Sequence, residues 1–170
     1  GHTPSGIFRG GKYSSFEAGT RIPLLVKWPG KVTANTSTAA QFSQIDLFAS
    51  FAALGGQHLS ENTAPDSDNM INVLLGKSLK GRDYIIQQSA NNTLSVIKDG
   101  WKFIPPANGP AISKYTNIEL GNSSHAQLYD LTKDPGEKNN LATENPAMVT
   151  KLAILLEKER AMGAENPSNH

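Results

Sequence analysis

The sequence predicts an α+β fold in which a small antiparallel sheet is packed by a C-terminal helix. Three observations support this prediction. Apolar and polar residues alternate between positions 83 and 104, which is the period of β-strands. An Asp-Gly pair at 99–100 divides that stretch and favours a tight hairpin. Residues 145–162 then carry apolar side chains at helical spacing. A chain of 170 residues is long enough to enclose one hydrophobic core.

The front of the chain opens with a Gly-rich loop, which an apolar run follows. That run extends from Ile22 to Trp28 and is closed by Pro29-Gly30. Because it is short, rich in β-formers and bounded by breakers, it predicts a buried strand.

A helix is predicted next. Ser43 is the expected N-cap, with Asp46 three residues later in a variant of the capping box. Apolar residues follow at helical spacing, and Gly55-Gly56 ends the helix. We expect Asp46 to favour the helix N-terminus through the backbone dipole. Residues 70–75 predict one further short helical turn, which Gly76 ends.

Four strands are expected in the second half of the chain: 84–88, 93–98, 101–104 and 127–131. The Pro-, Gly- and Asn-rich residues 105–126 predict a loop, with room for one short strand at 114–120. The final helix is expected to begin at the Asn145-Pro146 pair, since Asn caps helices well and Pro suits their first position. Gly163 is its expected end.

Composition excludes several classes of function. The formal net charge is +1, so there is no electrostatic case for binding nucleic acid or an anionic membrane. No apolar run reaches the roughly 18 residues of a membrane span, and no signal peptide is recognised. With no cysteine, the chain holds no thiolate zinc site or cysteine nucleophile. The acids Glu61, Asp66 and Asp68 lack the EF-hand pattern, so we expect no metal site here.

The candidate site residues are basic. Lys12 lies on a glycine-lined turn, where an ammonium and bare backbone N–H groups can meet an oxyanion; a solvated turn is the alternative. Arg9 precedes it and is a second candidate for an anionic substrate, with surface solvation as its alternative. Glu17 and Arg21 are four residues apart, and we expect them to support the loop through charge-assisted hydrogen bonds.

Several motifs resemble the sulfatase family, in the family's order along nearly the whole chain. They are Gly11-Lys12, Phe16-Glu17-Ala18-Gly19, Arg21-Ile22-Pro23, Trp28-Pro29-Gly30, Asp46-Leu47-Phe48, Trp101-Lys102-Phe103, Gln127-Leu128-Tyr129-Asp130-Leu131 and Asp134-Pro135-Gly136-Glu137 with Asn140-Leu141. Ala18 departs from the family's pattern, which has glycine there.

This resemblance implies a role for Lys12. It matches the family's active-site lysine, whose ammonium contacts a sulfate oxygen. His125 is implied as a candidate at the rim of the substrate cleft, with a plain loop histidine as the alternative. The formylglycine nucleophile, the ligands of the divalent cation (calcium or another) and the catalytic histidines are expected upstream of this chain. His2 alone lies near that region and is expected to be a terminal or tag residue. The isolated chain is therefore expected to be inactive.

The resemblance also implies an organisation. Residues 1–80 would be the end of the large α/β domain, and residues 81–170 the small C-terminal subdomain. Strand 22–28 would then lack its neighbours, so the chain would pair with a missing N-terminal sulfatase domain or form a homo-oligomer. The implied substrate is a sulfated small molecule or carbohydrate, and the implied location is periplasmic or secreted. Two alternatives stay open: a phosphonate or phosphodiester hydrolase, and a non-catalytic binding module derived from a sulfatase.

Overall fold

The computed structural model describes residues 4–60 and 62–164, which form two compact units. The first, here called the sheet unit, joins the chain up to Ile22 with the chain from Ile86 onward. The second, here called the helical unit, comprises Pro23–Ile85. The residues before Pro23 pack with the sheet, while the expected boundary at residue 80 stays a prediction.

Four strands form one sheet in the order β1-β2-β3-β4. They are β1 (Tyr84–Gln88), β2 (Leu94–Lys98), β3 (Trp101–Ile104) and β4 (Gln127–Asp130). The pairs β2–β3 and β3–β4 are antiparallel. The predicted α+β class with a small antiparallel sheet is therefore confirmed. The short strand expected at 114–120 does not form. A single isolated β-bridge between Ile112 and Glu119 lies in this region.

The hairpin between β2 and β3 turns where the sequence predicts. Asp99 has φ 52° and Gly100 has φ 78°, so both central residues adopt the positive φ of a type I′ turn. Lys98 pairs with Trp101 across it. The Asp-Gly pair thus sets the register of the sheet's centre.

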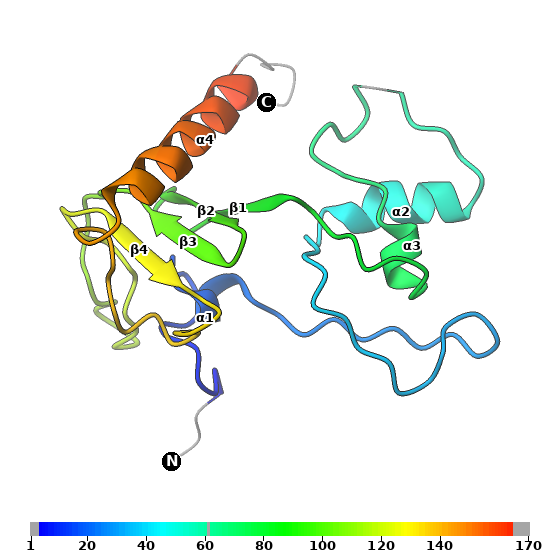
Figure 1. Ribbon diagram of the computed structural model, residues 1–170, viewed down its shortest axis with the longest axis horizontal. Coiled ribbons are helices and arrows are strands. Elements are labelled where there is room, and N and C mark those ends of the chain that lie inside the picture. The colour runs from blue at the N-terminus through cyan, green and yellow to red at the C-terminus, as the bar shows by residue number, and fades with distance from the viewer. Residues whose placement is uncertain (1–3, 61, 165–170) are drawn as a thin grey trace. The chain divides into compact units, whose positions relative to one another are not determined.

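The C-terminal helix α4 (Pro146–Ala164) begins at the predicted proline and runs past Gly163, its expected end. The helix contacts β2 and β3, and Leu152 and Leu156 are buried (Figure 1). It therefore supplies the apolar cover that the sheet needs on one face.

The two faces of the sheet have different neighbours. The cross-strand row Val96, Phe103 and Leu128 is buried and lies on one face. On the other, Ile104 and Tyr129 form a buried cluster with Phe16, whose ring meets that of Tyr129 edge to face at 6.1 Å. Phe16 directly precedes the short helix α1 (Glu17–Thr20), so this second face holds the segment that follows Lys12.

The helical unit contains α2 (Asp46–Leu54) and α3 (Ile71–Leu74), and the sequence predicts a helical segment at both places. The two helices are in contact. The chain leaves α2 through Gly55 and Gly56, the latter at φ 71°. The N-cap of α2 is Ile45 and not Ser43 as predicted. The Ser43 backbone N–H nevertheless donates to the Asp46 carboxylate (2.9 Å), which is one half of the expected capping box.

The prediction of a buried strand at 22–28 is wrong for this chain. The segment forms no strand, and Leu25 is 87% exposed. Its other large apolar side chains, Ile22, Leu24, Val26 and Trp28, are also exposed. A strand needs a hydrogen-bonded neighbour, and the described residues supply none for this segment. Within residues 4–60 and 62–164, no helix has the length and apolar character needed to cross a membrane.

Candidate functional site

Lys12 lies at the tip of a loop that residues 9–18 close. Ala18 N–H donates to the Arg9 carbonyl (3.0 Å) at the base of this loop, and Ser14 N–H donates to the Gly11 carbonyl (3.0 Å) across its tip. Lys12 is exposed, and its Nζ lies 5.0 Å from the centre of the Tyr13 ring. Within the described part of the chain, its ammonium has no anionic partner. It is therefore available to an anion from solution.

The backbone beside Lys12 is held in an uncommon conformation. Tyr13 has φ 82°, which L residues with large side chains rarely adopt. Its carbonyl accepts a hydrogen bond from Ala90 N–H (3.2 Å), and Ser15 N–H donates to the Leu120 carbonyl (2.9 Å). Such strain persists only where the surroundings fix it, and it is common at functional sites.

A hollow of about 380 Å³ lies beside this turn. Its lining is mixed and consists of Tyr13, Ser14, Gly19, Gln88, Ser89, Ala90 and Asn92. The Gln88 amide donates to Asn92 Oδ1 (3.0 Å), which leaves one amide oxygen and one amide nitrogen to meet a ligand. The Tyr13 ring is half exposed and adds an apolar surface. The arrangement can bind a small polyhydroxylated or anionic molecule.

Arg9, the second basic candidate, is engaged within the protein. Its guanidinium donates to both carboxylate oxygens of Glu119 (2.9 and 2.8 Å) and to the Glu137 carbonyl (2.8 Å). It also lies 4.1 Å from the centre of the Phe16 ring. The Arg9 guanidinium lowers the pKa of Glu119. Contact between Arg9 and a substrate stays a prediction, since the contacts in this structure tie Arg9 to the base of the loop.

Three charged side chains are buried together beneath the Lys12 loop. Lys102 on β3 is wholly buried, and its Nζ lies 3.0 Å from Glu17 Oε1 and 3.2 Å from Glu137 Oε1. Glu17 N–H donates to Glu137 Oε2 (2.6 Å). Arg21 Nη1 pairs with the other Glu17 oxygen (3.2 Å), which confirms the expected Glu17–Arg21 contact. We call Glu17, Lys102 and Glu137 the buried charge cluster.

Burial changes proton affinities in this part of the sheet unit. Desolvation raises the pKa of Glu137, and the Lys102 ammonium and Glu17 N–H only partly oppose it. Desolvation also raises the pKa of Tyr129 to about 12, and its hydroxyl donates to Gln127 Oε1 (2.9 Å). Tyr129 is therefore neutral at physiological pH.

Sequence reasoning missed Lys102 and Glu137 as partners of Glu17. A signal for Lys102 exists: it alternates with Trp101 and Phe103 in an apolar strand, so one face had to bury an ammonium. Glu137 carries a weaker signal, since it follows the Pro-Gly turn at φ 51°, where a residue other than glycine is uncommon.

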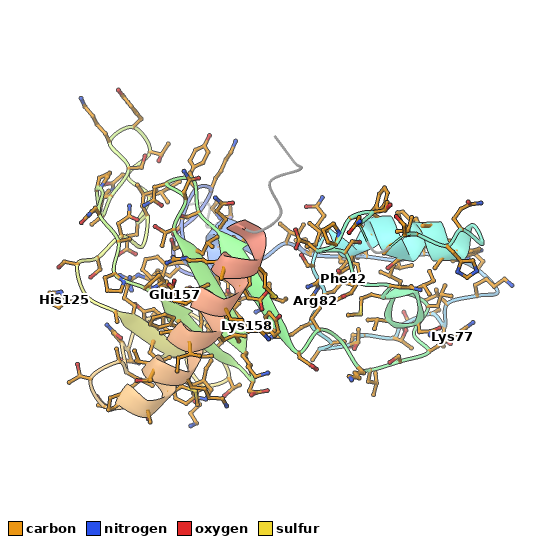
Figure 2. All side chains as sticks on the ribbon, turned by 90° about the horizontal axis from the view of Figure 1, so that it is seen from above. Phe42, Lys77, Arg82, His125, Glu157 and Lys158 are labelled. Atoms are coloured by element: carbon orange, nitrogen blue, oxygen red, sulfur yellow. The ribbon has the colours of Figure 1, made fainter. Side chains whose placement is uncertain are left out.

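His125 does not join this cluster. It is exposed in the loop before β4, and its ring points away from the sheet (Figure 2). Ser124 Oγ lies 3.1 Å from its Nδ1. Its role at a cleft rim stays a prediction. His2 and Glu61 lie outside the described residues.

The helical unit has its own buried ion pair. Asp46 is wholly buried, and Arg82 donates to it through Nε (2.8 Å to Oδ2). Burial alone would raise the pKa of Asp46, but Arg82 and the N–H groups of Ser43 and Asp68 outweigh it, so the pKa is lowered. Asp46 therefore does more than favour the N-terminus of α2, because it joins that helix to the chain around Arg82.

The described residues contain no group of three His, Cys, Asp or Glu side chains able to hold a metal ion. Asp68, one of the acids in the 57–69 loop, instead lies 3.4 Å from Arg82. The residues present do not fit a divalent cation site.

Two comparisons with known proteins give close matches to one family. The chain is 57% identical over 157 residues to the N-acetylgalactosamine-6-O-sulfatase of Bacteroides thetaiotaomicron, covering 92% of this chain and 30% of that protein. It is 29% identical over 158 residues to mouse steryl-sulfatase, covering 82% of this chain and 25% of that protein. No family model matches the chain.

A solved structure agrees with this result. It is a sulfatase structure from a study of glycosaminoglycan metabolism by Bacteroides thetaiotaomicron, and it superimposes with a TM-score of 0.90 at 56% identity. The match covers 95% of this chain and 33% of that one. The chain thus spans about a quarter to a third of the length of these relatives.

Proposed function

This chain belongs to the sulfatase family, and from that premise we propose that it is the C-terminal portion of a sulfate-ester hydrolase to which it contributes Lys12. In the complete protein, the Lys12 ammonium binds a sulfate oxygen. It neutralises the charge that develops there as the bond from sulfur to the leaving oxygen breaks.

The local structure at Lys12 is the observation that supports this role most strongly. The side chain is exposed at the tip of a loop that backbone hydrogen bonds close, and it has no anionic partner among the described residues. The backbone next to it is held in an uncommon conformation, with Tyr13 at φ 82°, and such conformations are common at functional sites.

The proposed substrate class is a sulfated carbohydrate. The hollow beside Lys12 presents the amides of Gln88 and Asn92, which suit hydroxyl groups, and the Tyr13 ring, which suits the apolar face of a sugar. The relative that is 57% identical is named for an N-acetylgalactosamine sulfate, which is a ligand of this kind.

The rest of the catalytic machinery belongs, in this proposal, to an upstream portion of the protein. That portion would supply the nucleophile and bind the divalent cation, calcium being the ion that the family implies. The exposed apolar segment 22–28 gives it a place to pair, since an added strand would satisfy the free backbone groups there. A homo-oligomer through the same segment is the competing proposal.

The test uses the active protein that contains this chain as its C-terminal portion. Lys12→Ala is expected to lower kcat/KM for a sulfated sugar by 10²- to 10³-fold, because one donor to a developing anion contributes about 3–4 kcal/mol. Lys114→Ala is the matched control. It also removes an exposed lysine followed by tyrosine, and it should change kcat/KM less than twofold.

Two outcomes would contradict the proposal. In the first, Lys12→Ala and Lys114→Ala have equal and small effects on turnover of the sulfate ester. In the second, the protein hydrolyses a phosphonate or phosphate diester and no sulfate ester, which would assign Lys12 to a different oxyanion. Absence of any turnover or sulfate binding would favour the non-catalytic binding module.

A further inference from the structure

Glu137 binds both ends of the loop that carries Lys12. The base of this loop is closed by Ala18 N–H and the Arg9 carbonyl. On one side of the base, the Arg9 guanidinium donates to the Glu137 carbonyl (2.8 Å). On the other, Glu17 N–H donates to Glu137 Oε2 (2.6 Å). One residue therefore holds two segments whose separation determines the shape of the loop.

Lys102 lies next to the Glu137 carboxyl group in a buried environment. Neither side chain is exposed, and the Nζ to Oε1 distance is 3.2 Å. Lys102 also pairs with Glu17 (3.0 Å), and Arg21 pairs with the second oxygen of Glu17. Two carboxylates thus face two cations, so each charge at the base of the loop has an opposite charge next to it.

Glu137 is itself fixed to the sheet. Its N–H donates to the Asp134 carbonyl (3.1 Å), and Asp134 N–H donates to the carbonyl of Asp130 on β4 (2.7 Å). The Asp134 carboxylate accepts from the N–H groups of Lys138 and Asn139 (2.7 Å each). These contacts hold Glu137 at φ 51°. Glu137 thereby connects the 9–18 loop to β4, which lies more than a hundred residues later in the sequence.

We propose that Glu137 is a positioning residue for Lys12: with Lys102 as its counter-ion, it clamps the 9–18 loop so that the ammonium meets the sulfate in one place. Glu137 itself touches no substrate. The inference rests on the proposed function for its catalytic consequence, but the clamp is a property of the chain alone. The two can therefore be tested separately.

The first experiment measures the clamp without any activity. Trypsin cleaves after Lys12 and after Lys114, and both bonds join lysine to tyrosine, so the second site is a control inside the same molecule. Cleavage within a fixed loop requires local opening. In Glu137→Ala, cleavage after Lys12 relative to Lys114 should rise at least tenfold under native conditions, as mass spectrometry of the fragments would show.

Two further variants serve as a conservative replacement and as a control for this cleavage ratio. Glu137→Gln keeps the shape and one acceptor oxygen, so the ratio should rise less than in Glu137→Ala, and it provides a readout if the alanine variant does not fold. Asp46→Ala removes another wholly buried carboxylate, in the helical unit, and should leave the ratio unchanged. An unchanged ratio in both Glu137 variants, or an equal rise in Asp46→Ala, overturns the clamp.

The second experiment connects the clamp to Lys12 in the active protein. Glu137→Ala should lower kcat/KM for the sulfate ester at least tenfold. The double variant Lys12→Ala/Glu137→Ala should be no slower than Lys12→Ala, within twofold, because a residue that acts through Lys12 has no effect once Lys12 is gone. If the kcat/KM losses of the two single variants multiply in the double variant, Glu137 acts independently of Lys12 and supports only the general fold.

The two proposals fail in different ways. If Lys12→Ala leaves kcat/KM unchanged, the proposed function is wrong. The ratio of trypsin cleavage after Lys12 to cleavage after Lys114 then still tests the clamp. If Lys12→Ala removes activity but the trypsin ratio does not respond to Glu137, the proposed function stands and the clamp is wrong.

Discussion

Individual buried charges connect distant parts of this chain. Each unit encloses at least one wholly buried carboxylate, Glu137 in the sheet unit and Asp46 in the helical unit, and each has a basic partner. Leaving one member of such a pair without its partner costs far more than the pair contributes over apolar residues. These positions should therefore tolerate replacement poorly.

The Asp46–Arg82 pair makes a prediction about pH. The folded pKa of Asp46 is lowered, so the pair contributes stability above the unfolded value of about 3.9 and loses it as pH falls through the folded pKa. Asp46→Asn should lower the free energy of unfolding by roughly 3 kcal/mol at pH 7. In urea titrations, the difference from the wild type should shrink below about pH 4.

Asp68→Asn is the control for that experiment. Asp68 also faces Arg82 (3.4 Å), but its side chain is 57% exposed, so its loss should cost less than about 1 kcal/mol. Equal losses in the two variants at pH 7, or a loss in Asp46→Asn that does not change with pH, would contradict the assignment of the buried pair.

At the scale of elements, the β2–β3 hairpin is the part of the fold most closely determined by local sequence. Gly100 is needed at φ 78°, and a Cβ there would lie 2.6 Å from the Cγ2 of Thr132. Its carbonyl accepts from Leu131 N–H (2.9 Å), so the turn also fixes the end of β4. The turn thus helps to set the register of both the β2–β3 pair and the β3–β4 pair.

Gly100→Ala should therefore destabilise the protein by about 2 kcal/mol, the sum of a left-handed alanine and a steric clash. Gly6→Ala is matched to it, because Gly6 has φ 58° but nothing within 4 Å of the added atom, so only the conformational cost of about 1 kcal/mol applies. Thermal unfolding of both variants measures the difference. A Gly6→Ala loss as large as that of Gly100→Ala would show that the contact with Thr132 has no effect.

At the scale of the whole molecule, the helical unit exposes several large apolar side chains. Phe48 and Phe51 on α2 are 55% and 57% exposed, and Leu25 in the extended segment is 87% exposed. Large exposed apolar side chains are expected where a protein forms an interface. Under the proposal above, an upstream portion of the same protein would cover these side chains.

The chain alone should therefore associate in a concentration-dependent way, which light scattering after size exclusion measures. Leu25→Lys and Phe48→Lys should each shift it toward the monomer, since charge on the apolar surface disfavours pairing. Tyr115→Lys is the control: this residue is 90% exposed in a loop of the sheet unit, and its replacement should change nothing. A chain that is monomeric at all concentrations would be evidence against an unsatisfied interface.

The sequence alone determined the elements whose geometry is local. The Asp99-Gly100 turn, the strands on either side of it, the end of α2 at Gly55 and the start of α4 at Pro146 all form as predicted. Turn residues, caps and hydrophobic period act over a few neighbouring residues, so their effect can be read directly from the chain. The ordered motifs likewise indicate the family from the sequence alone.

Only the tertiary structure decided which distant residues meet. Segment 22–28 has the sequence of a strand, yet it stays unpaired because a strand forms only with a neighbour. Arg9 meets Glu119 across 110 positions, and Lys102 meets Glu17 across 85. Composition and spacing carry no information on such encounters, because they depend on how the elements pack. The loop that presents Lys12 could be found in the sequence, but the buried charges that fix it could not.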